Sequence, residues 1–513
     1  MSLFNGRLSK LQAIINIIDN KYVDHVDIDS LNELVIPDIL SRLDPHTSYV
    51  PAQRLNDTEK KVLGYFYGIG IEHYTFDDTV TVISVTRGSP AAHADIKPGD
   101  RILKVDTTDV TGKNSQNIAS TVLKGEHGTM ATLVLKRHGC DSTLTTTIRR
   151  GSVPVPAITS AYMIDETTAY IKLDNFSDKS YIAFAAQVHF LKEDGAKKLI
   201  IDLRDNLGGR LEQARLIASE ILAPGDTITY TIGRANVIED LYTCNNDNRI
   251  CDGMSIACIV NSHTASAAEI LAAAIQDNDR GAIVGRRTFG KGLVQTPIQM
   301  QDGSQINLTT YRYYAPSGRS LQKGYKNYNN DFNNRAKNGE FDSASAFHPT
   351  DTTKYFTKHG RTMYAKSGVM PDVFVPWGVN PPPYIAYKLD SAYITMRYAA
   401  EMYNRLGFFD THDPDPFINA LFDDEQQTYD HLIEYAIQHG VNIDTRKQKK
   451  EIAEAFQTAI NLLKSDAYYT AGDRNNSAMC INESDPDVQA AVEIVNDDER
   501  LHTILNDQTN STK

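Results

Sequence analysis

The feature that most constrains the fold is a regular alternation of short apolar runs and helical runs between about residues 160 and 320. Strand-like runs occur at 169–173, 199–203, 256–260 and 282–285, and helical runs occur at 181–191, 211–222 and 267–276. Strands separated in this way by helices are joined by crossover connections, so the strands lie parallel and the helices cover the sheet. The sequence therefore predicts an α/β core in this region.

The chain of 513 residues is too long for one compact core, since domains usually hold about 100–200 residues. Its changes in texture predict an α/β multidomain protein. The predicted parts are a helical N-terminal subdomain (1–63), a β-rich domain with one or two helices (64–150), the α/β core (151–380) and a helical C-terminal subdomain (381–513). Within the core, residues 325–366 are polar and are predicted to be an insertion or a flexible loop.

Composition excludes several classes of function. The net charge is −13 and the acidic residues are spread along the chain, which argues against a nucleic-acid surface. No stretch approaches the roughly 20 apolar residues of a membrane helix, so no membrane span is predicted. The opening residues carry no secretory signal, although such a start can also replace a removed leader.

The five cysteines lack the paired spacing of a zinc site, so no metal is predicted. Cys244 and Cys251 flank a polar run and can pair in an oxidising compartment, but free thiols are the favoured interpretation.

Three segments with chemical potential each follow a predicted strand, where α/β sheets bind their ligands. The first, residues 204–209, reads R-D-N-L-G-G. Its adjacent glycines allow backbone N–H groups to approach a ligand, although the same pattern also makes an ordinary tight turn.

The second segment, residues 261–270, joins a strand to a helix through small residues. A serine at this junction, Ser266, can attack with its developing oxyanion close to free amides at the helix N-terminus. The alternative is a plain N-cap, a position that serine and threonine favour. His263 lies in the same turn, and without an aspartate placed by a motif it is interpreted as a surface or capping histidine.

The third segment, residues 285–295, contains Lys291 between two glycines. A lysine that reaches inward has its pKa lowered by burial, and its neutral amine can accept a serine proton. The alternative is a solvated lysine on a hairpin.

Taken together, these motifs resemble those of the C-terminal processing peptidases, also called tail-specific proteases. Residues 264–270 (T-A-S-A-A-E-I) match the family's serine motif, and residues 288–295 (T-F-G-K-G-L-V-Q) match its lysine motif 25 residues later. Residues 202–209, 312–322 and 371–373 match further family blocks, and residues 43–49 (L-D-P-H-T-S-Y) also have a counterpart. The resemblance runs from about residue 8 to 376. Residues 261–264 replace the family's usual small run, and Ala268 replaces a frequent serine.

The β-rich domain resembles the PDZ domain that this family carries. Its expected carboxylate-binding loop, whose backbone N–H groups hold a substrate's terminal carboxylate, comprises Tyr67, Gly68, Ile69, Gly70 and Ile71. Residues 88–92 and 96–103 also follow the typical PDZ sequence.

The resemblance implies a serine endopeptidase that cleaves proteins at or near free, often apolar C-terminal tails. It assigns Ser266 as the nucleophile and Lys291 as the general base. Gln295 would orient the lysine, because a residue four positions along a strand shares its face. The amides of Gly208 and Ala267 would form the oxyanion hole, and Asp277 falls where some members support the site. No cofactor or metal is implied. The resemblance also implies an extracytoplasmic bacterial location, in the periplasm.

Three other functions remain open at this point. The chain could be a catalytically silent adaptor that binds peptides through its PDZ domain, although such an adaptor has no need for Lys291 and Gln295. It could carry a small ligand, as retinoid-binding relatives of this fold do. It could also be a Ser–His–Asp hydrolase that uses His263.

Overall fold

A six-stranded sheet forms the centre of the α/β part of the computed structural model, which describes residues 9–55, 63–349, 351–407 and 413–506. Its strand order is β10-β11-β12-β15-β16-β21, and every neighbouring pair is parallel except β10–β11. The strands are β10 (Ile158–Met163), β11 (Thr168–Leu173), β12 (Lys198–Asp202), β15 (Ser255–Val260), β16 (Ala282–Gly285) and β21 (Val373–Phe374). The predicted α/β core is confirmed.

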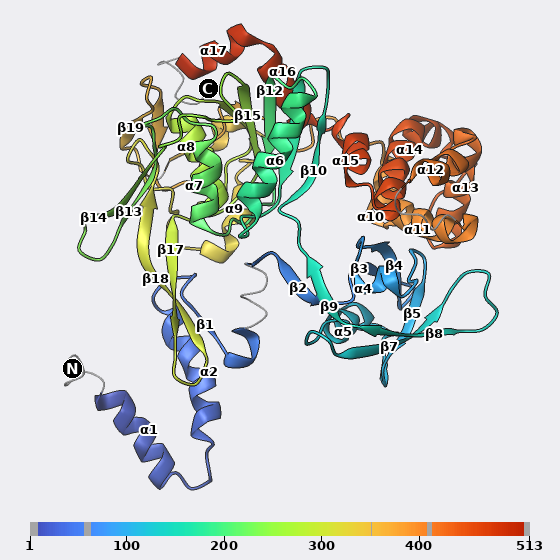
Figure 1. The fold of residues 1–513 in the computed structure, drawn as a ribbon, viewed down its shortest axis with the longest axis horizontal. Coiled ribbons are helices and arrows are strands. Elements are labelled where there is room, and N and C mark those ends of the chain that lie inside the picture. The colour runs from blue at the N-terminus through green and yellow to red at the C-terminus, as the bar shows by residue number, and fades with distance from the viewer. Residues whose placement is uncertain (1–8, 56–62, 350, 408–412, 507–513) are drawn as a thin grey trace.

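Helices cover both faces of this sheet (Figure 1). One face packs against α6 (Ser180–Glu193), α7 (Leu211–Ser219) and α8 (Ala267–Asp277), with Leu199 and Ile201 of β12 in the same core. The alternate residue Ile200 points to the other face, which packs against α16 (Pro486–Asn496). Because successive side chains of a strand point to opposite faces, a strand that is apolar throughout must be covered on both sides.

A second sheet lies beside the first and continues from the lysine segment. It has the order β1-β18-β13-β14, with β17 also paired to β18. The strands are β1 (Ser48–Val50), β13 (Thr227–Ile232), β14 (Ile238–Thr243), β17 (Leu293–Gln299) and β18 (Gln305–Tyr314). Since β1 belongs to residues 43–49 and their surroundings, this pairing brings the N-terminal part of the chain to the α/β core.

The β-rich domain has its own core and its own sheet, in the order β3-β4-β5-β7-β8 with β6 on β5. Its elements are β3 (Ile71–Phe76), β4 (Thr79–Val85), α4 (Pro90–His93), β5 (Arg101–Val105), β6 (Thr108–Asp109), α5 (Ser115–Val122), β7 (Met130–Lys136) and β8 (Leu144–Arg149). A two-stranded ribbon of β2 (Tyr65–Gly68) and β9 (Gly151–Pro154) links it to the rest of the chain (Figure 1).

The C-terminal helices divide between two cores, whereas the sequence predicts one subdomain from 381 to 513. A bundle with its own core comprises α10 (Tyr384–Ser391), α11 (Ile394–Leu406), α12 (Asp415–Leu421), α13 (Glu425–Gln438) and α14 (Lys449–Ala471). The following α15 (Arg474–Asn482) packs on α14 and also reaches β10, whereas α16 and α17 (Asp498–Asn506) lie against the central sheet. The apolar residues of α16 explain the difference. When they pack on the second face of the central sheet, both apolar surfaces are removed from water, which is favourable.

The bundle also packs on the β-rich domain, where Phe76, Ile83 and Ala400 form a small shared core. Figure 1 shows the bundle directly above this domain, with the ribbon β2–β9 on the side toward the central sheet. The C-terminal part of the chain therefore contacts both of the other folded units.

The two predicted N-terminal helices are present as α1 (Ser9–Lys21) and α2 (Ile28–Ser41), and they extend away from the central sheet (Figure 1). Among the described residues, none of the apolar core clusters includes a residue of either helix, and Leu34 is 72% exposed. The helical prediction is confirmed, but these helices do not build a separate core.

The described residues of the polar segment, 325–349 and 351–366, are folded rather than irregular. It contains η1 (Tyr328–Asn330), α9 (Asp331–Lys337), η2 (Ala344–Ala346), β19 (Lys354–Phe356) and β20 (Thr362–Tyr364). Arg335 and Phe341 are buried in it. Of the two predicted alternatives, the flexible loop is wrong for these residues, because buried arginine and aromatic groups, rather than a periodic apolar pattern, hold the segment in place. The alternative of an insertion stays a prediction.

Candidate active site

The three predicted segments meet at the carboxyl edge of the central sheet. Gly208 follows β12, Ser266 follows β15 and Lys291 follows β16. All three line one cavity of about 910 Å³, together with Ala267 and Gln295. Parallel strands end at the same edge, so residues far apart in the sequence converge there.

Ser266 occupies a strained backbone position. It precedes the first residue of α8 with φ 58° and ψ −121°, a region that residues with a side chain rarely adopt. Such strain costs about 1–3 kcal/mol and persists only where the surrounding structure imposes it. The turn presents the serine to the cavity at the positive end of a buried helix.

Gly208 lies in direct contact with this turn. A Cβ atom at Gly208 would stand 2.7 Å from Ser266 Cβ and 2.8 Å from the Ala267 nitrogen, so only glycine fits. The Gly208 N–H donates to Asn206 Oδ1 at 2.8 Å. The two expected oxyanion-hole residues are therefore adjacent, but the Gly208 N–H already has an acceptor in this structure.

Glu269 joins the serine turn to the lysine segment. One carboxylate oxygen accepts from the backbone N–H groups of Ser266 at 3.0 Å and Lys291 at 2.8 Å. The other accepts from Thr288 Oγ1 and the Gly290 N–H. The side chain is completely buried, and this burial raises its pKa. Sequence reasoning placed Glu269 in the serine motif but gave it no role.

Lys291 is partly buried beside the same cavity. Burial lowers its pKa, while the carboxylates of Glu269 and Asp44 oppose that shift. Its backbone carbonyl accepts a hydrogen bond from the Tyr313 hydroxyl, and Tyr313 also lines the cavity. Hydrogen bonds to the backbone of Lys291 thus hold the residue in place, and burial makes its side-chain amine easier to deprotonate.

Gln295 is connected differently from what the strand argument expects. Lys291 lies before β17, which begins at Leu293, and the pairing with β18 shifts register between Val294 and Gln295. The argument that both residues share one strand face is therefore wrong. Gln295 Nε2 donates to Thr309 Oγ1, and both Gln295 and Lys291 nevertheless border the cavity.

Residues 43–49 supply two groups close to the lysine that sequence reasoning missed. Asp44 accepts hydrogen bonds from Thr47, which is also bonded to Thr309, and its charge acts on Lys291. His46 shares a hydrogen bond with the Tyr328 hydroxyl, and burial lowers its pKa to about 4. The only sequence signal for this proximity was the L-D-P-H-T-S-Y block.

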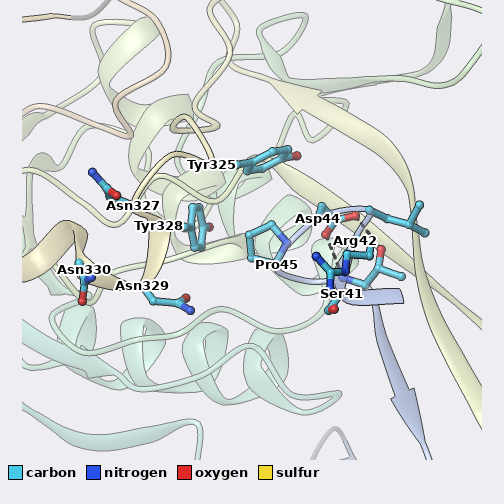
Figure 2. Close-up of a pocket in the computed structure, with 11 residues that line it drawn as sticks. Ser41, Arg42, Asp44, Pro45, Tyr325, Asn327, Tyr328, Asn329 and Asn330 are labelled. Atoms are coloured by element: carbon cyan, nitrogen blue, oxygen red, sulfur yellow. Dashed lines mark hydrogen bonds between the residues drawn. The ribbon is translucent and has the colours of Figure 1, made fainter. Parts of the chain in front are cut away.

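A second cavity of about 680 Å³ is lined by residues of this block and of the polar segment. Figure 2 shows Pro45 between Tyr328 of the polar segment and the side chains of Asp44 and Arg42. The polar segment also supports the lysine loop, because Arg335 donates to the carbonyls of Arg287 and Thr288. The segment therefore packs against the loop that leads to Lys291.

His263 has an aspartate partner that no motif indicated. Its Nδ1 lies 3.0 Å from Asp205 Oδ1, and its ring stacks on Phe332. Both polar side chains are largely exposed, at 54% and 68%, and neither lines the cavity that contains Ser266. Asp277 lies at the far end of α8, where it pairs with Arg319.

The expected carboxylate loop connects β2 to β3. Ile69 is buried and Gly70 has φ +84° with Ser89 packed against it, so the loop has a fixed shape. β3 is an edge strand and α5 lies beside it. Between these two elements Gln116 Nε2 donates to the His73 carbonyl, and Thr75 Oγ1 donates to Gln116 Oε1.

Cys244 and Cys251 are both buried free thiols, as the favoured interpretation had it. Across the described ranges, no cluster of three or more His, Cys, Asp or Glu side chains could hold a metal ion. Within the same ranges, no helix is both long enough and apolar enough to cross a membrane.

Comparison with known proteins places the chain. Residues 167–327 match the model of peptidase family S41, and residues 68–148 match the PDZ domain model. The carboxy-terminal-processing protease of Bartonella bacilliformis is 32% identical over 320 residues, which cover 62% of this chain and 73% of that protein. The carboxy-terminal processing protease CtpA of Bacillus subtilis is 30% identical, over 62% of this chain and 67% of its own length.

A solved structure of a photosystem II D1 C-terminal processing protease is also similar, with 25% identity and a TM-score of 0.38, covering 74% of this chain and 95% of that one. The two matched models reproduce the predicted order of a PDZ domain followed by a protease core. The chain belongs to the carboxy-terminal processing proteases of peptidase family S41 and carries a PDZ domain.

Proposed function

We propose that this chain is a Ser–Lys endopeptidase that cleaves proteins at or near their C-terminal tails, with Ser266 as nucleophile and Lys291 as general base. The observation that carries the proposal is the convergence of both residues on one cavity, with Ser266 on a strained turn and the pKa of Lys291 lowered by burial. Perturbed titratable groups beside a strained nucleophile are typical of active sites.

In the proposed reaction, the neutral Lys291 amine takes the Ser266 hydroxyl proton while Oγ bonds to the scissile carbonyl carbon. The tetrahedral intermediate collapses when the lysine ammonium gives that proton to the leaving amine, which yields an acyl-enzyme and a free C-terminal fragment. Water then repeats the two steps, with Lys291 again as the base, and releases the N-terminal fragment.

The Ala267 amide and the adjacent Gly208 amide are the proposed donors to the oxyanion. Both belong to residues in contact with Ser266, and Ala267 begins α8, whose dipole favours negative charge there. Because Asn206 Oδ1 holds the Gly208 N–H, that bond must open or be shared when the oxyanion forms. Gln295 lines the same cavity and is held by its hydrogen bond to Thr309, so its side chain is proposed to contact the substrate.

Substrate tails are proposed to bind the PDZ domain. Its loop Tyr67–Gly68–Ile69–Gly70–Ile71 would hold the terminal carboxylate, and the tail would add as a strand to the free edge of β3. The preceding residues of the tail, often apolar, would contact α5.

The test is digestion of a loosely folded protein with an apolar free C-terminus by wild type, Ser266→Ala, Lys291→Ala and His263→Ala. We expect cleavage by wild type and His263→Ala, and a loss of at least a thousandfold in the other two. Activity that survives in Lys291→Ala but is lost in His263→Ala would overturn the dyad. Inactivity of the wild type together with binding of the tail would identify an adaptor. The extracytoplasmic, periplasmic location remains a prediction for cell fractionation.

A further inference from the structure

The N-terminal end of α16 carries two aspartates, the N-cap Asp485 and Asp487, that bind the segments following β12 and β16. Asp485 caps the helix and accepts from its N–H groups, and its second oxygen accepts from Arg204 Nη1 at 2.6 Å. Asp487 is 4% exposed and accepts two hydrogen bonds from Arg286, at 2.9 and 2.6 Å. Arg204 also reaches Asp487, at 3.3 Å.

The two arginines lie just after β12 and β16, two parallel strands of the central sheet that are separated by β15. Arg204 stands two residues after the end of β12 and four residues before Gly208. Arg286 directly follows β16 and stands five residues before Lys291. Each arginine is thus the first charged residue of a loop that carries a proposed active-site group.

The charged side chains of this network are buried, so each depends on its partners in the protein rather than on water. The side chains of Arg286, Asp487 and Arg204 are 10%, 5% and 16% exposed. Arg286 has one further described acceptor, the Val375 carbonyl, and Arg204 is also bonded to Asp202. A buried arginine that loses its carboxylate must move toward water, because an uncompensated buried charge is strongly unfavourable.

We propose that Asp487 is a positioning residue for proteolysis, through which the C-terminal segment sets the distance between the loop of Gly208 and the loop of Lys291. The inference rests on the proposed function of those loops and extends the active machinery to residues beyond 380. The bidentate pair with Arg286 and the longer bond to Arg204 attach both loops to one rigid helix that also packs on the sheet.

The experiment compares wild type, Asp487→Asn and the matched control Val495→Ala in the full chain. Val495 is fully buried on the same helix and packs against the same sheet, so its truncation weakens α16 without touching an arginine. We expect kcat to fall at least tenfold in Asp487→Asn with KM changed less than threefold, and both constants to stay within threefold of wild type in Val495→Ala. Hydrogen exchange should accelerate in peptides 205–209 and 287–292 only in Asp487→Asn.

Equal kcat in the two variants, or exchange that accelerates along α16 alike in both, would overturn the proposal and leave α16 a purely stabilising helix. If Asp487→Asn does not fold, Arg286→Lys replaces it, because lysine keeps the charge but cannot make the bidentate pair, and the same tenfold loss is expected. If the wild type itself cleaves nothing, the proposed function fails, and the exchange pattern alone then decides the role of Asp487.

Discussion

At the scale of single residues, the proposed chemistry depends on how charges surround Lys291. Burial lowers its pKa, whereas the negative charges of Glu269 and Asp44 favour the protonated form. The base must be neutral to accept the serine proton, so kcat/KM should rise with pH as the lysine loses its proton. The midpoint of that rise lies below the ordinary lysine pKa.

Removing the charge of Asp44 should therefore shift the pH profile. In Asp44→Asn the amide oxygen can still accept from the backbone, but the charge that stabilises the ammonium is gone. The pKa of Lys291 then falls further, and the rising limb of kcat/KM moves to lower pH. A pH–rate series on both proteins measures this shift, and a limb that moves to higher pH would contradict the electrostatic assignment.

Glu269 should be needed for activity because its carboxylate connects the Ser266 turn to the Lys291 loop. In Glu269→Gln, one oxygen becomes an NH₂ group that faces backbone donors, so bonds to the Ser266 turn or to the Lys291 loop are lost. Each unsatisfied buried donor costs about 1–3 kcal/mol. We expect kcat/KM to fall by about a hundredfold, together with slower labelling by a serine-reactive fluorophosphonate. The exposed Glu493→Gln serves as control, and equal labelling of both variants would contradict this role.

At the scale of elements, α5 is bonded directly to the edge strand β3 of the PDZ domain. Gln116 bonds to the backbone of β3 on the edge where a peptide strand would add. A tail that pairs with this edge must first displace that side chain. The wild type should therefore bind tails more weakly than a variant that lacks this hydrogen bond.

Gln116→Ala should bind an apolar free-tail peptide about two- to tenfold more tightly than wild type, the equivalent of about one hydrogen bond. Asn117→Ala, an exposed change on the same helix, should bind as wild type does. Titration with a fluorescent peptide measures both. Weaker binding by Gln116→Ala alone would mean that this side chain contacts the tail directly.

At the scale of the whole molecule, the C-terminal part of the chain holds the PDZ domain and the protease core together. The bundle touches the PDZ domain through the shared core at Phe76 and through Gly99, where a Cβ atom would stand 2.5 Å from the Ala400 carbonyl. Glu72 of β3 pairs with Arg474 at the start of α15, twelve residues before α16 begins. The PDZ position is therefore set by more than its two linking strands.

Gly99→Ala should detach the PDZ domain from the bundle. Gly112→Ala is a matched control, because Gly112 has a similar positive φ, +89° against +83°, but open space around it. Both changes carry the same backbone strain of about 1–2 kcal/mol, and only the first adds a clash. Small-angle scattering should show a larger radius of gyration for Gly99→Ala alone. Identical scattering from both variants would show that the contact does not hold the domain.

Features that depend on local pattern could be predicted from the amino-acid sequence. Apolar strands alternating with helices defined the central sheet, and the motifs around Gly208, Ser266 and Lys291 followed strands that end at one edge. Parallel topology brings such ends together wherever the exact contacts fall, so the candidate cavity was predictable. The PDZ domain was predictable for a different reason, because its characteristic loop and turn residues are contiguous in the sequence.

The segments from distant parts of the chain that surround this cavity could not be predicted, because long-range packing brings them there. Asp44 and His46 approach Lys291 because β1 pairs with β18, and no local pattern encodes that pairing. The polar segment packs on the lysine loop through the buried Arg335. Arginine is usually exposed to solvent, so the sequence does not predict this contact. Asp487 reaches Arg286 across 201 residues because a sheet face needs a covering helix, and the amphipathic pattern of α16 does not specify which face it covers.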